Sequence, residues 1–312
     1  MRSVPALIKR EILESKNSFV LTPLILAGIA ITLVSLTLLG FGNMQFIDGM
    51  QENGVQTFSD LIVQMQKHRP DDWREAMMVG YWVVTMPVWA VMPFVIFFGL
   101  LGSLYEERRD RSILFWKSMP VPDWQEVLVK LAVPLLVVPL IFLMIAILAQ
   151  IIIATLFTVV LAVQGGDIGA VWPFGLMLKV WFSSVGANLL FALWGLPLTA
   201  WVLFVSSFAA RMPFMWAVLP PALIVIVEGM FSNTAMFGKW LAIHAGAWLG
   251  ETIDQYAGHQ MINGPREVLI KLTGGPFFEM LAQSMINVQF WFGLIIAAGF
   301  VYGAVYMRKQ AL

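Results

Sequence analysis

Cysteine is absent from this chain of 312 residues. A disulfide framework, a thiol nucleophile and a cysteine-ligated metal are therefore excluded. The formal net charge is zero, so no overall electrostatic attraction favours nucleic acid as a partner. Histidine is scarce, and neither a His-Glu-x-x-His nor a Gly-x-Ser-x-Gly motif accompanies His68, His244 or His259. No metal site and no catalytic residue are expected.

Charged residues are missing over long stretches. Asp, Glu, Lys and Arg do not occur in 17–47, 76–105, 131–166, 180–210 or 280–307. A sixth stretch, 212–238, is interrupted only by Glu228. A helix needs about 20 apolar residues to cross the hydrocarbon core, and all six stretches exceed that length.

These stretches predict an all-α integral membrane protein, with residues 1–312 as one domain. The hydrophobic content of 59% and the mean hydropathy of +0.80 agree with this class. Six transmembrane helices are expected, at 18–39, 77–103, 131–162, 180–208, 213–230 and 285–306. The first apolar run is too long for the core of a signal peptide, about 7–15 residues, so it is expected to be a retained span.

Basic residues predict the orientation. If the N-terminus is cytoplasmic, 12 of the 19 Lys and Arg residues fall in the short inner segments. These are Arg2, Lys9, Arg10, Lys16, Arg108, Arg109, Arg111, Lys117, Lys130, Arg211, Arg308 and Lys309. By the positive-inside rule, both termini are therefore expected in the cytoplasm.

The segments outside the spans also carry patterns. Apolar residues recur at helical spacing within 1–17, which predicts an amphipathic helix in the inner membrane interface, with a solvated tail as the alternative. The outer loop 231–284 is expected to hold short helices. The link between 180–208 and 213–230 is so short that these two helices should be antiparallel neighbours.

The inner loop 104–130 is the most charged part of the chain. Local spacing predicts ion pairs from Glu106 to Arg109 and from Glu107 to Arg111, and one from Glu126 to Lys130. A short apolar cluster follows the first of these charges: Ile113, Leu114, Phe115 and Trp116. Such a cluster indicates either a docking surface or a helix lying among lipid headgroups, and the physics of the residues leaves both open.

Two motifs in this loop carry a family resemblance. Tyr105-Glu106-Glu107-Arg108 precedes the cluster, and Lys117-Ser118-Met119-Pro120-Val121 follows it. Together with the predicted six spans, they resemble the type-2 family of ATP-binding-cassette permeases. The resemblance implies a transmembrane exporter subunit in a bacterial inner (cytoplasmic) membrane. A second permease subunit, expected to give a homodimer, and two copies of a separate cytoplasmic ATPase subunit would complete the transporter.

In such a transporter, residues 108–118 would seat in a groove of the ATPase subunit. The resemblance implies these coupling residues: Glu106, Glu107, Arg108, Arg109, Arg111, Ile113, Leu114, Phe115, Trp116 and Lys117. No Gly-x-x-x-x-Gly-Lys-Ser/Thr phosphate loop occurs, so the chain is not expected to be an enzyme by itself. ATP and magnesium would bind to the partner subunit, and membrane lipid would surround the chain.

Three polar residues within the apolar runs are candidates for a substrate path. Glu228 is the one charge in its run, and the alternative is that span five simply ends there. Gln150 and Asn188 are uncharged, and hydrogen bonding between helices is the expected role of both. Two other classes remain as alternatives: an ion-driven carrier or channel, and a membrane-embedded hydrolase.

Overall fold

A computed structural model of the chain describes residues 3–39, 63, 67, 73–164, 168–231, 235–247, 282 and 285–311. Every regular element within these ranges is a helix. Six helices are long and apolar enough to cross a membrane, which confirms the predicted all-α membrane fold. They are Asn17–Leu38, Trp73–Arg109, Asp123–Gln164, Phe174–Trp194, Pro213–Phe231 and Val288–Gln310.

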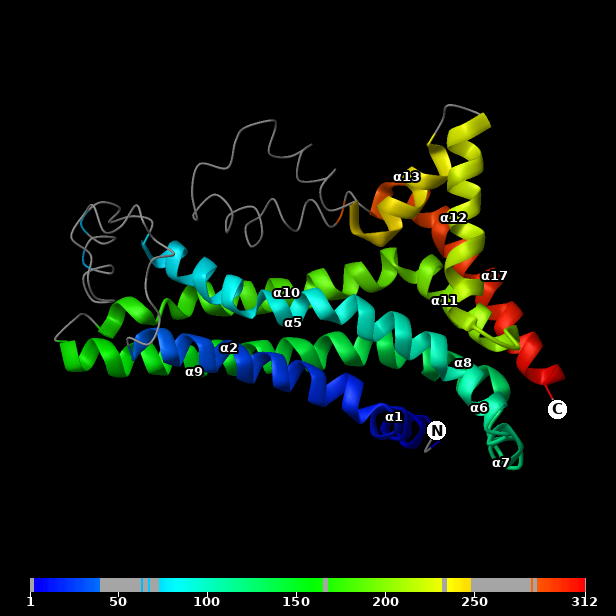
Figure 1. Ribbon diagram of the computed structural model, residues 1–312, viewed down its shortest axis with the longest axis horizontal. Helices are drawn as coiled ribbons and strands as arrows, with labels where there is room; N and C mark the ends of the chain where they lie inside the picture. The colour runs from blue at the N-terminus through cyan, green and yellow to red at the C-terminus, as the bar shows by residue number, and fades with distance from the viewer. Residues whose placement is uncertain are drawn as a thin grey trace.

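Four long helices run side by side along most of the molecule (Figure 1). They are α2 (Thr22–Leu38), α5 (Trp73–Ser103), α9 (Val138–Gln164) and α10 (Phe174–Trp194). Apolar side chains from three of them, including Ala27, Val88 and Phe142, form one buried cluster. Other apolar side chains on these helices, such as Phe94 and Met144, are exposed, as expected of a surface that faces lipid.

Both ends of the chain lie at the same end of this bundle (Figure 1). The N-terminal helix α1 (Ser3–Glu14) confirms the helix predicted within 1–17. Its Leu7 and Ile8 pack against the apolar cluster of the bundle, while Lys9 is exposed. The apolar face of α1 therefore contacts the rest of the protein.

The third span begins with α8 (Asp123–Ala132), which continues through the π-helical turn η3 (Val133–Val137) into α9. Pro134 lies in that turn and has no N–H to donate to the preceding turn of helix. A π turn is one way for a helix to accommodate a missing bond of this kind.

The fourth predicted span, 180–208, is not one helix. It begins earlier, as α10 at Phe174, and breaks at Gly195 before α11 (Leu196–Phe208). Pro197 supplies the reason, because it lacks the N–H that would bond to the carbonyl of Leu193. Helix α10 alone is long and apolar enough to cross a membrane, and α11 is a shorter apolar helix.

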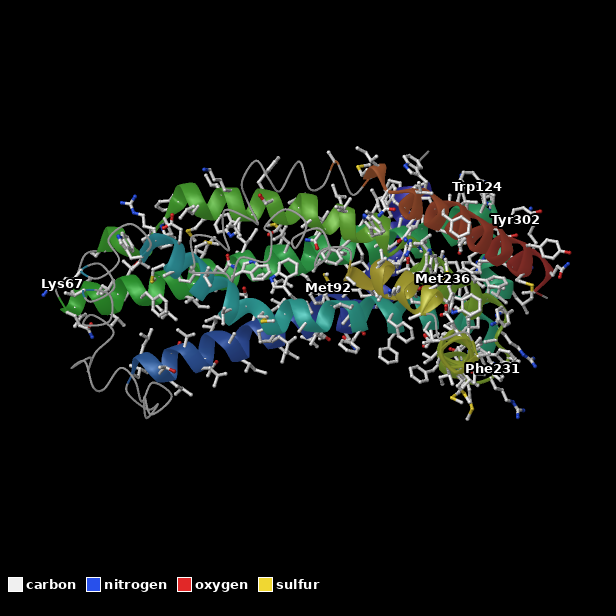
Figure 2. The ribbon with its side chains drawn as sticks, turned by 90° about the horizontal axis from the view of Figure 1, so that it is seen from above. Lys67, Met92, Trp124, Phe231, Met236 and Tyr302 are labelled. Carbon is white, nitrogen blue, oxygen red and sulfur yellow. The ribbon has the colours of Figure 1, made fainter. Side chains whose placement is uncertain are left out.

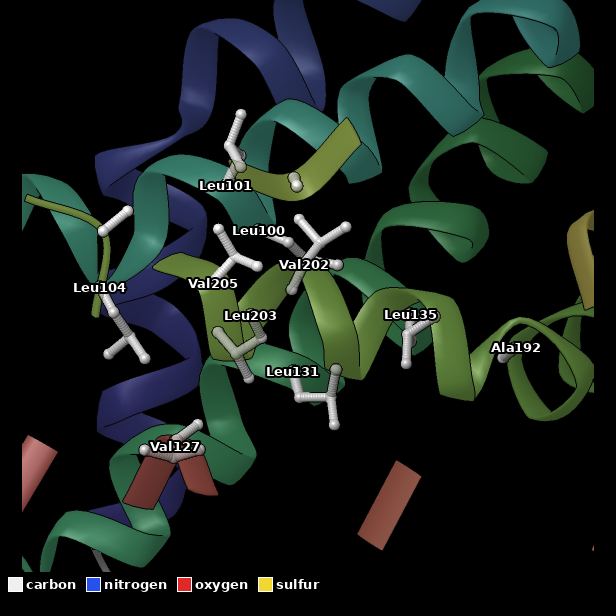
Figure 3. Close-up of a cluster of buried hydrophobic side chains, with 13 residues drawn as sticks. Leu100, Leu101, Leu104, Val127, Leu131, Leu135, Ala192, Val202, Leu203 and Val205 are labelled. Atoms are coloured by element: carbon white, nitrogen blue, oxygen red, sulfur yellow. The ribbon is translucent and has the colours of Figure 1, made fainter. Parts of the chain in front are cut away.

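Helix α11 packs along the last helix, α17 (Val288–Gln310). The contact is close at Gly303, where an added Cβ would lie 2.8 Å from the ring of Phe204. Figure 3 shows Leu203 and Val205 of α11 in a buried cluster with Leu100 of α5 and Leu131 of α8. This cluster joins the second, third and last spans at the end where the termini lie.

Helix α12 (Pro213–Phe231) does not lie antiparallel beside the preceding long helix as expected. It rises steeply away from one end of the four long helices in Figure 1 and is seen end-on, close to Phe231, in Figure 2. The turn before it is tight, and Met212 in that turn has a φ of 51°. Ala217 is its one buried residue, so its apolar surface is open on nearly all sides.

Two short helical segments follow α12, namely α13 (Met236–Ala242) and the π turn η5 (Ile243–Ala247). They lie within the predicted outer loop 231–284, and residues 248–281 of that loop lie outside the described residues. His244 is buried here, with ring centroids 4.3 Å from Trp240 and 5.4 Å from Trp194. Burial lowers the pKa of His244, although the carbonyls of Trp240 and Gln289 act in the opposite direction.

Candidate functional site: the elbow between the second and third spans

The loop between the second and third spans folds into two short helices. Helix α6 (Tyr105–Arg109) follows α5, and α7 (Ile113–Lys117) follows α6. Residues 104–122, called the elbow below, lie at the same end of the molecule as both termini (Figure 1). Arg111 joins the two helices with a φ of 58°, a left-handed conformation that costs about 1 kcal/mol or more for a residue other than glycine.

The apolar cluster on α7 divides into a buried part and an exposed part. Ile113 is buried, and Trp116 is half-buried beneath the guanidinium of Arg10, which lies 4.1 Å from the ring centroid. Leu114 and Phe115 are 56% and 62% exposed. Of the four apolar residues expected to form the cluster, these two are the exposed ones.

Buried ion pairs hold the elbow to the rest of the molecule. Glu107 of α6 is buried, and its Oε2 accepts a hydrogen bond from Nη1 of Arg308 at 2.6 Å. Its Oε1 lies 3.0 Å from Nζ of Lys130 in α8. Glu107 thus connects the elbow to the third span and to the last span.

Arg308 forms several of these buried ion pairs. It is 3% exposed, and it lies in the last turn of α17. Besides Glu107, it contacts Glu126 at 2.9 Å and Asp123 at 3.3 Å, both in α8. Three carboxylates from two elements therefore surround one guanidinium.

The N-terminal helix completes the arrangement. Lys130 donates to Oε1 of Glu11 at 2.8 Å, and Arg10 donates to Oε1 of Glu126 at 3.2 Å. We call the seven residues the ion-pair junction: Arg10, Glu11, Glu107, Asp123, Glu126, Lys130 and Arg308. It joins α1, α6, α8 and α17, which are far apart in the sequence.

Acidic groups outnumber basic ones at this junction. Glu14 lies at its edge, 3.7 Å from Arg10. Burial, and then the neighbouring carboxylate of Glu11, raise the pKa of Glu14. Burial alone would lower the pKa of Arg10, but hydrogen bonds to Glu126 and Glu11 outweigh it, so that pKa is raised. Arg10 therefore remains charged.

Hydrogen bonds to uncharged groups of α11 and its C-cap add a second attachment for the elbow. Arg108 donates to the carbonyls of Ser206 and Ala209, at 2.8 and 2.9 Å. The Ser206 hydroxyl accepts from the backbone N–H groups of Leu104 and Tyr105, each at 3.0 Å. The elbow is thus fastened to the end of α11 as well.

The end of the chain touches α7 directly. Lys117 donates to the carbonyl of Lys309 at 3.3 Å and also to the carbonyl of Ala311. The final residues of α17 therefore lie against the short helix that presents Leu114 and Phe115.

The ion pairs differ from those that local spacing predicted. Glu107 pairs with Lys130 and Arg308 in place of Arg111, and Arg109 pairs with its neighbour Asp110 at 2.9 Å, both well exposed. The hydrogen bond from Arg109 lowers the pKa of Asp110 and outweighs burial, which acts in the opposite direction. Glu106 is exposed, with its carboxylate close to Gly102.

Six of the seven residues of the ion-pair junction were not among the predicted coupling residues: Arg10, Glu11, Asp123, Glu126, Lys130 and Arg308. A signal for two of them was present, because Lys130 and Arg308 are the charges that border the uncharged runs 131–166 and 280–307. The predicted orientation places both borders on the inner side of the membrane. Charges that border several spans on one side are positioned to meet.

The candidate path residues lie apart from the elbow. Gln150 is buried, donates to the hydroxyl of Thr85 at 3.2 Å, and accepts from the indole of Trp181 at 2.8 Å. It therefore joins α9, α5 and α10, which is the expected role. Asn188 is half-buried in α10, and its side-chain nitrogen is buried with no hydrogen-bond partner.

Glu228 lies near the end of α12. Its carboxylate accepts from the N–H groups of Met236 at 2.6 Å and Phe237 at 2.9 Å, which begin α13. It acts as a cap for that helix, since the first N–H groups of a helix have no partner within it. Among the described residues, no three His, Asp or Glu side chains are placed to hold a metal ion.

Comparison with protein-family models, curated proteins and solved structures finds no match. The resemblance to type-2 permeases therefore depends on the residues of the elbow and on the arrangement of the spans.

Proposed function

We propose that this chain is the membrane-spanning permease subunit of an ATP-driven exporter in a bacterial inner membrane. The loop 104–130, which includes the elbow, would couple the permease to a separate ATPase subunit. The observation that carries the proposal is the pair of exposed apolar residues, Leu114 and Phe115, on an elbow whose first helix is held in place by the buried ion pairs of Glu107.

Exposed apolar side chains on a fixed support are typical of an interface with another protein. Leu114 and Phe115 belong to α7, which Lys117 attaches to α17. The preceding helix of the elbow, α6, is attached to α11 through Arg108. Figure 1 shows α7 farther from the centre of the bundle than α1. If α1 lies in the membrane interface, α7 extends beyond it toward water, which favours docking over insertion among headgroups.

In the proposed mechanism, two copies of this chain and two ATPase subunits form one transporter. The ATPase subunits bind ATP and magnesium, and their closure draws the two elbows together. The spans rearrange in response, and hydrolysis restores the starting state. The chain itself hydrolyses no ATP, and its contribution is differential contact with the closed and open states of its partner.

The double substitution Leu114→Ala with Phe115→Ala tests this proposal. The full-length protein is extracted from native membranes in mild detergent, and its stoichiometric companions are identified by mass spectrometry. We expect a soluble ATPase to accompany the wild type and to be lost from the double variant, because the variant removes the apolar contact area. Membrane insertion and the thermal midpoint should stay unchanged, since both side chains are exposed.

The matched control is the double variant Leu13→Ala with Trp124→Ala. Both residues are also exposed and apolar, at 59% and 51%, and lie on α1 and α8 at the same end of the molecule. The control should retain the ATPase. A wild-type protein that copurifies with no ATPase, or that moves cargo in vesicles without one, would contradict the proposal and favour an ion-driven carrier.

A further inference from the structure

Arg308 has a contact geometry that a simple charge would not provide. Its three nitrogens each face a different carboxylate: Nη1 is 2.6 Å from Glu107, Nη2 is 2.9 Å from Glu126, and Nε is 3.3 Å from Asp123. A guanidinium is planar and presents its donors in a fixed fork. Movement of α6 or α8 relative to α17 would therefore disturb several bonds at once.

The rest of the buried face of α17 is equally constrained. Ala297 and Ala304 are fully buried, and Gly303 lies against the ring of Phe204 in α11. Helix α11 in turn holds the beginning of the elbow through Ser206. The elbow, α17 and α11 thus form a closed ring of contacts. Arg308 is the buried ionic link between the elbow and α17, and Lys117 adds a more exposed contact with the end of α17.

We propose that Arg308 is a positioning residue that makes the last span move together with the elbow when the ATPase partner closes. This inference rests on the function proposed above. It identifies the contact through which a movement of the elbow is transmitted to α17. Packed elements with close, specific contacts move as units, so a single buried link between two of them controls whether they move together. The substitution Arg308→Gln removes the charge and the fork, whereas Arg308→Lys keeps the charge alone.

The absence of cysteine permits a direct test, because introduced cysteines are the only labelling sites. Spin labels are placed at Leu148→Cys on α9 and Tyr302→Cys on α17, both exposed, and the distance between them is measured by pulsed electron resonance. A second pair, Leu148→Cys with Ser118→Cys, reports on the elbow. Each pair is measured in the complex with the copurified ATPase, without nucleotide and with ATP plus vanadate.

We expect both pairs to change distance with ATP in the wild-type background. In Arg308→Gln, the elbow pair should still change while the α17 pair loses its change, and Arg308→Lys should restore part of it. Lys309→Gln, an exposed neighbour, is the matched control and should behave as the wild type. Thermal midpoints of all variants show whether they are folded.

An α17 pair that changes equally in Arg308→Gln and in the wild type would overturn the inference while leaving the proposed function intact. If Arg308→Gln is not recovered folded, Arg308→Lys decides, and a complete wild-type change in that variant would equally overturn it. A wild-type protein with no ATPase companion would instead refute the proposed function, so the two failures are distinguishable.

Discussion

The molecule buries polar groups in two regions, and it does so in different ways. At the ion-pair junction, charged side chains from four helices meet where the chain ends and the elbow begins. In the middle of the bundle, Gln150 joins three helices through neutral hydrogen bonds to Thr85 and Trp181. Charges are expensive within the hydrocarbon core, whereas at the borders of the spans water and headgroups are near. The position along the span thus determines which kind of polar contact the chain uses.

The two kinds of contact also have different consequences. A neutral hydrogen bond between helices stabilises by about 1 kcal/mol in a membrane. Removing one partner of a buried ion pair costs about 3–5 kcal/mol, because it leaves a buried charge without compensation. The junction should therefore be the more sensitive region to substitution.

Lys130→Met should give the largest effect on stability. Lys130 is 2% exposed and lies between Glu11 and Glu107, so the variant removes the positive charge that the two buried carboxylates share. Glu11 then keeps only Arg10, and Glu107 keeps Arg308 and the more distant Arg10. We expect a loss of about 3–5 kcal/mol in the free energy of unfolding, measured by denaturant titration in detergent. Lys9→Met on the exposed side of α1 is the control, and an equal loss in both variants would mean that packing alone holds the junction.

Gln150→Leu should give a smaller effect. The leucine fits the apolar surroundings, but it leaves the indole N–H of Trp181 without its partner. We expect a loss of about 1 kcal/mol in the same titration. Thr155→Val is the control, because that exposed hydroxyl only donates to the carbonyl of Ile151 in its own helix. A loss as large as that of Lys130→Met would remove the distinction between the two regions.

Glu14→Gln should give the smallest effect, and one of opposite sign. The pKa of Glu14 is raised from 4.5 in the folded protein, so its charged form is disfavoured there, and at pH 7 the charge opposes folding. Gln removes that charge, and since Glu14 is half-exposed we expect a gain of about 0.5 kcal/mol or less at pH 7.

The gain from Glu14→Gln should disappear as the pH falls below 4.5, where the wild-type carboxyl is protonated in both the folded and the unfolded state. Thermal midpoints of the two proteins at pH 7 and pH 4 check this. A destabilised variant at pH 7 would show that the excess of acidic groups at the junction carries no cost.

The spans could be predicted from the sequence because their signal is long and local. Twenty or more residues without charge have few alternatives to a membrane helix. The break at Gly195 was missed, although Pro197 was visible, because prolines are tolerated within spans such as α5, which contains Pro87 and Pro93. Whether a proline ends a helix depends on the neighbours that receive the freed backbone groups.

The partners of the charges could not be predicted for a different reason. Spacing along one helix favours pairs such as Glu107 with Arg111, each contributing only a few tenths of a kcal/mol, about 0.2–0.5. Tertiary packing offered Glu107 the buried partners Lys130 and Arg308, which come from helices folded against it. The stronger contacts are those between segments that only the fold brings together.

Ser206 shows how one side chain can set the register of two helices. The residue before α6, Leu104, makes no side-chain capping hydrogen bond. The Ser206 hydroxyl from α11 instead accepts hydrogen bonds from the N–H groups of Leu104 and Tyr105. The second span can neither lengthen by a turn nor slide along α11 without losing both bonds. A residue about a hundred positions downstream therefore decides where the second span stops and the elbow starts.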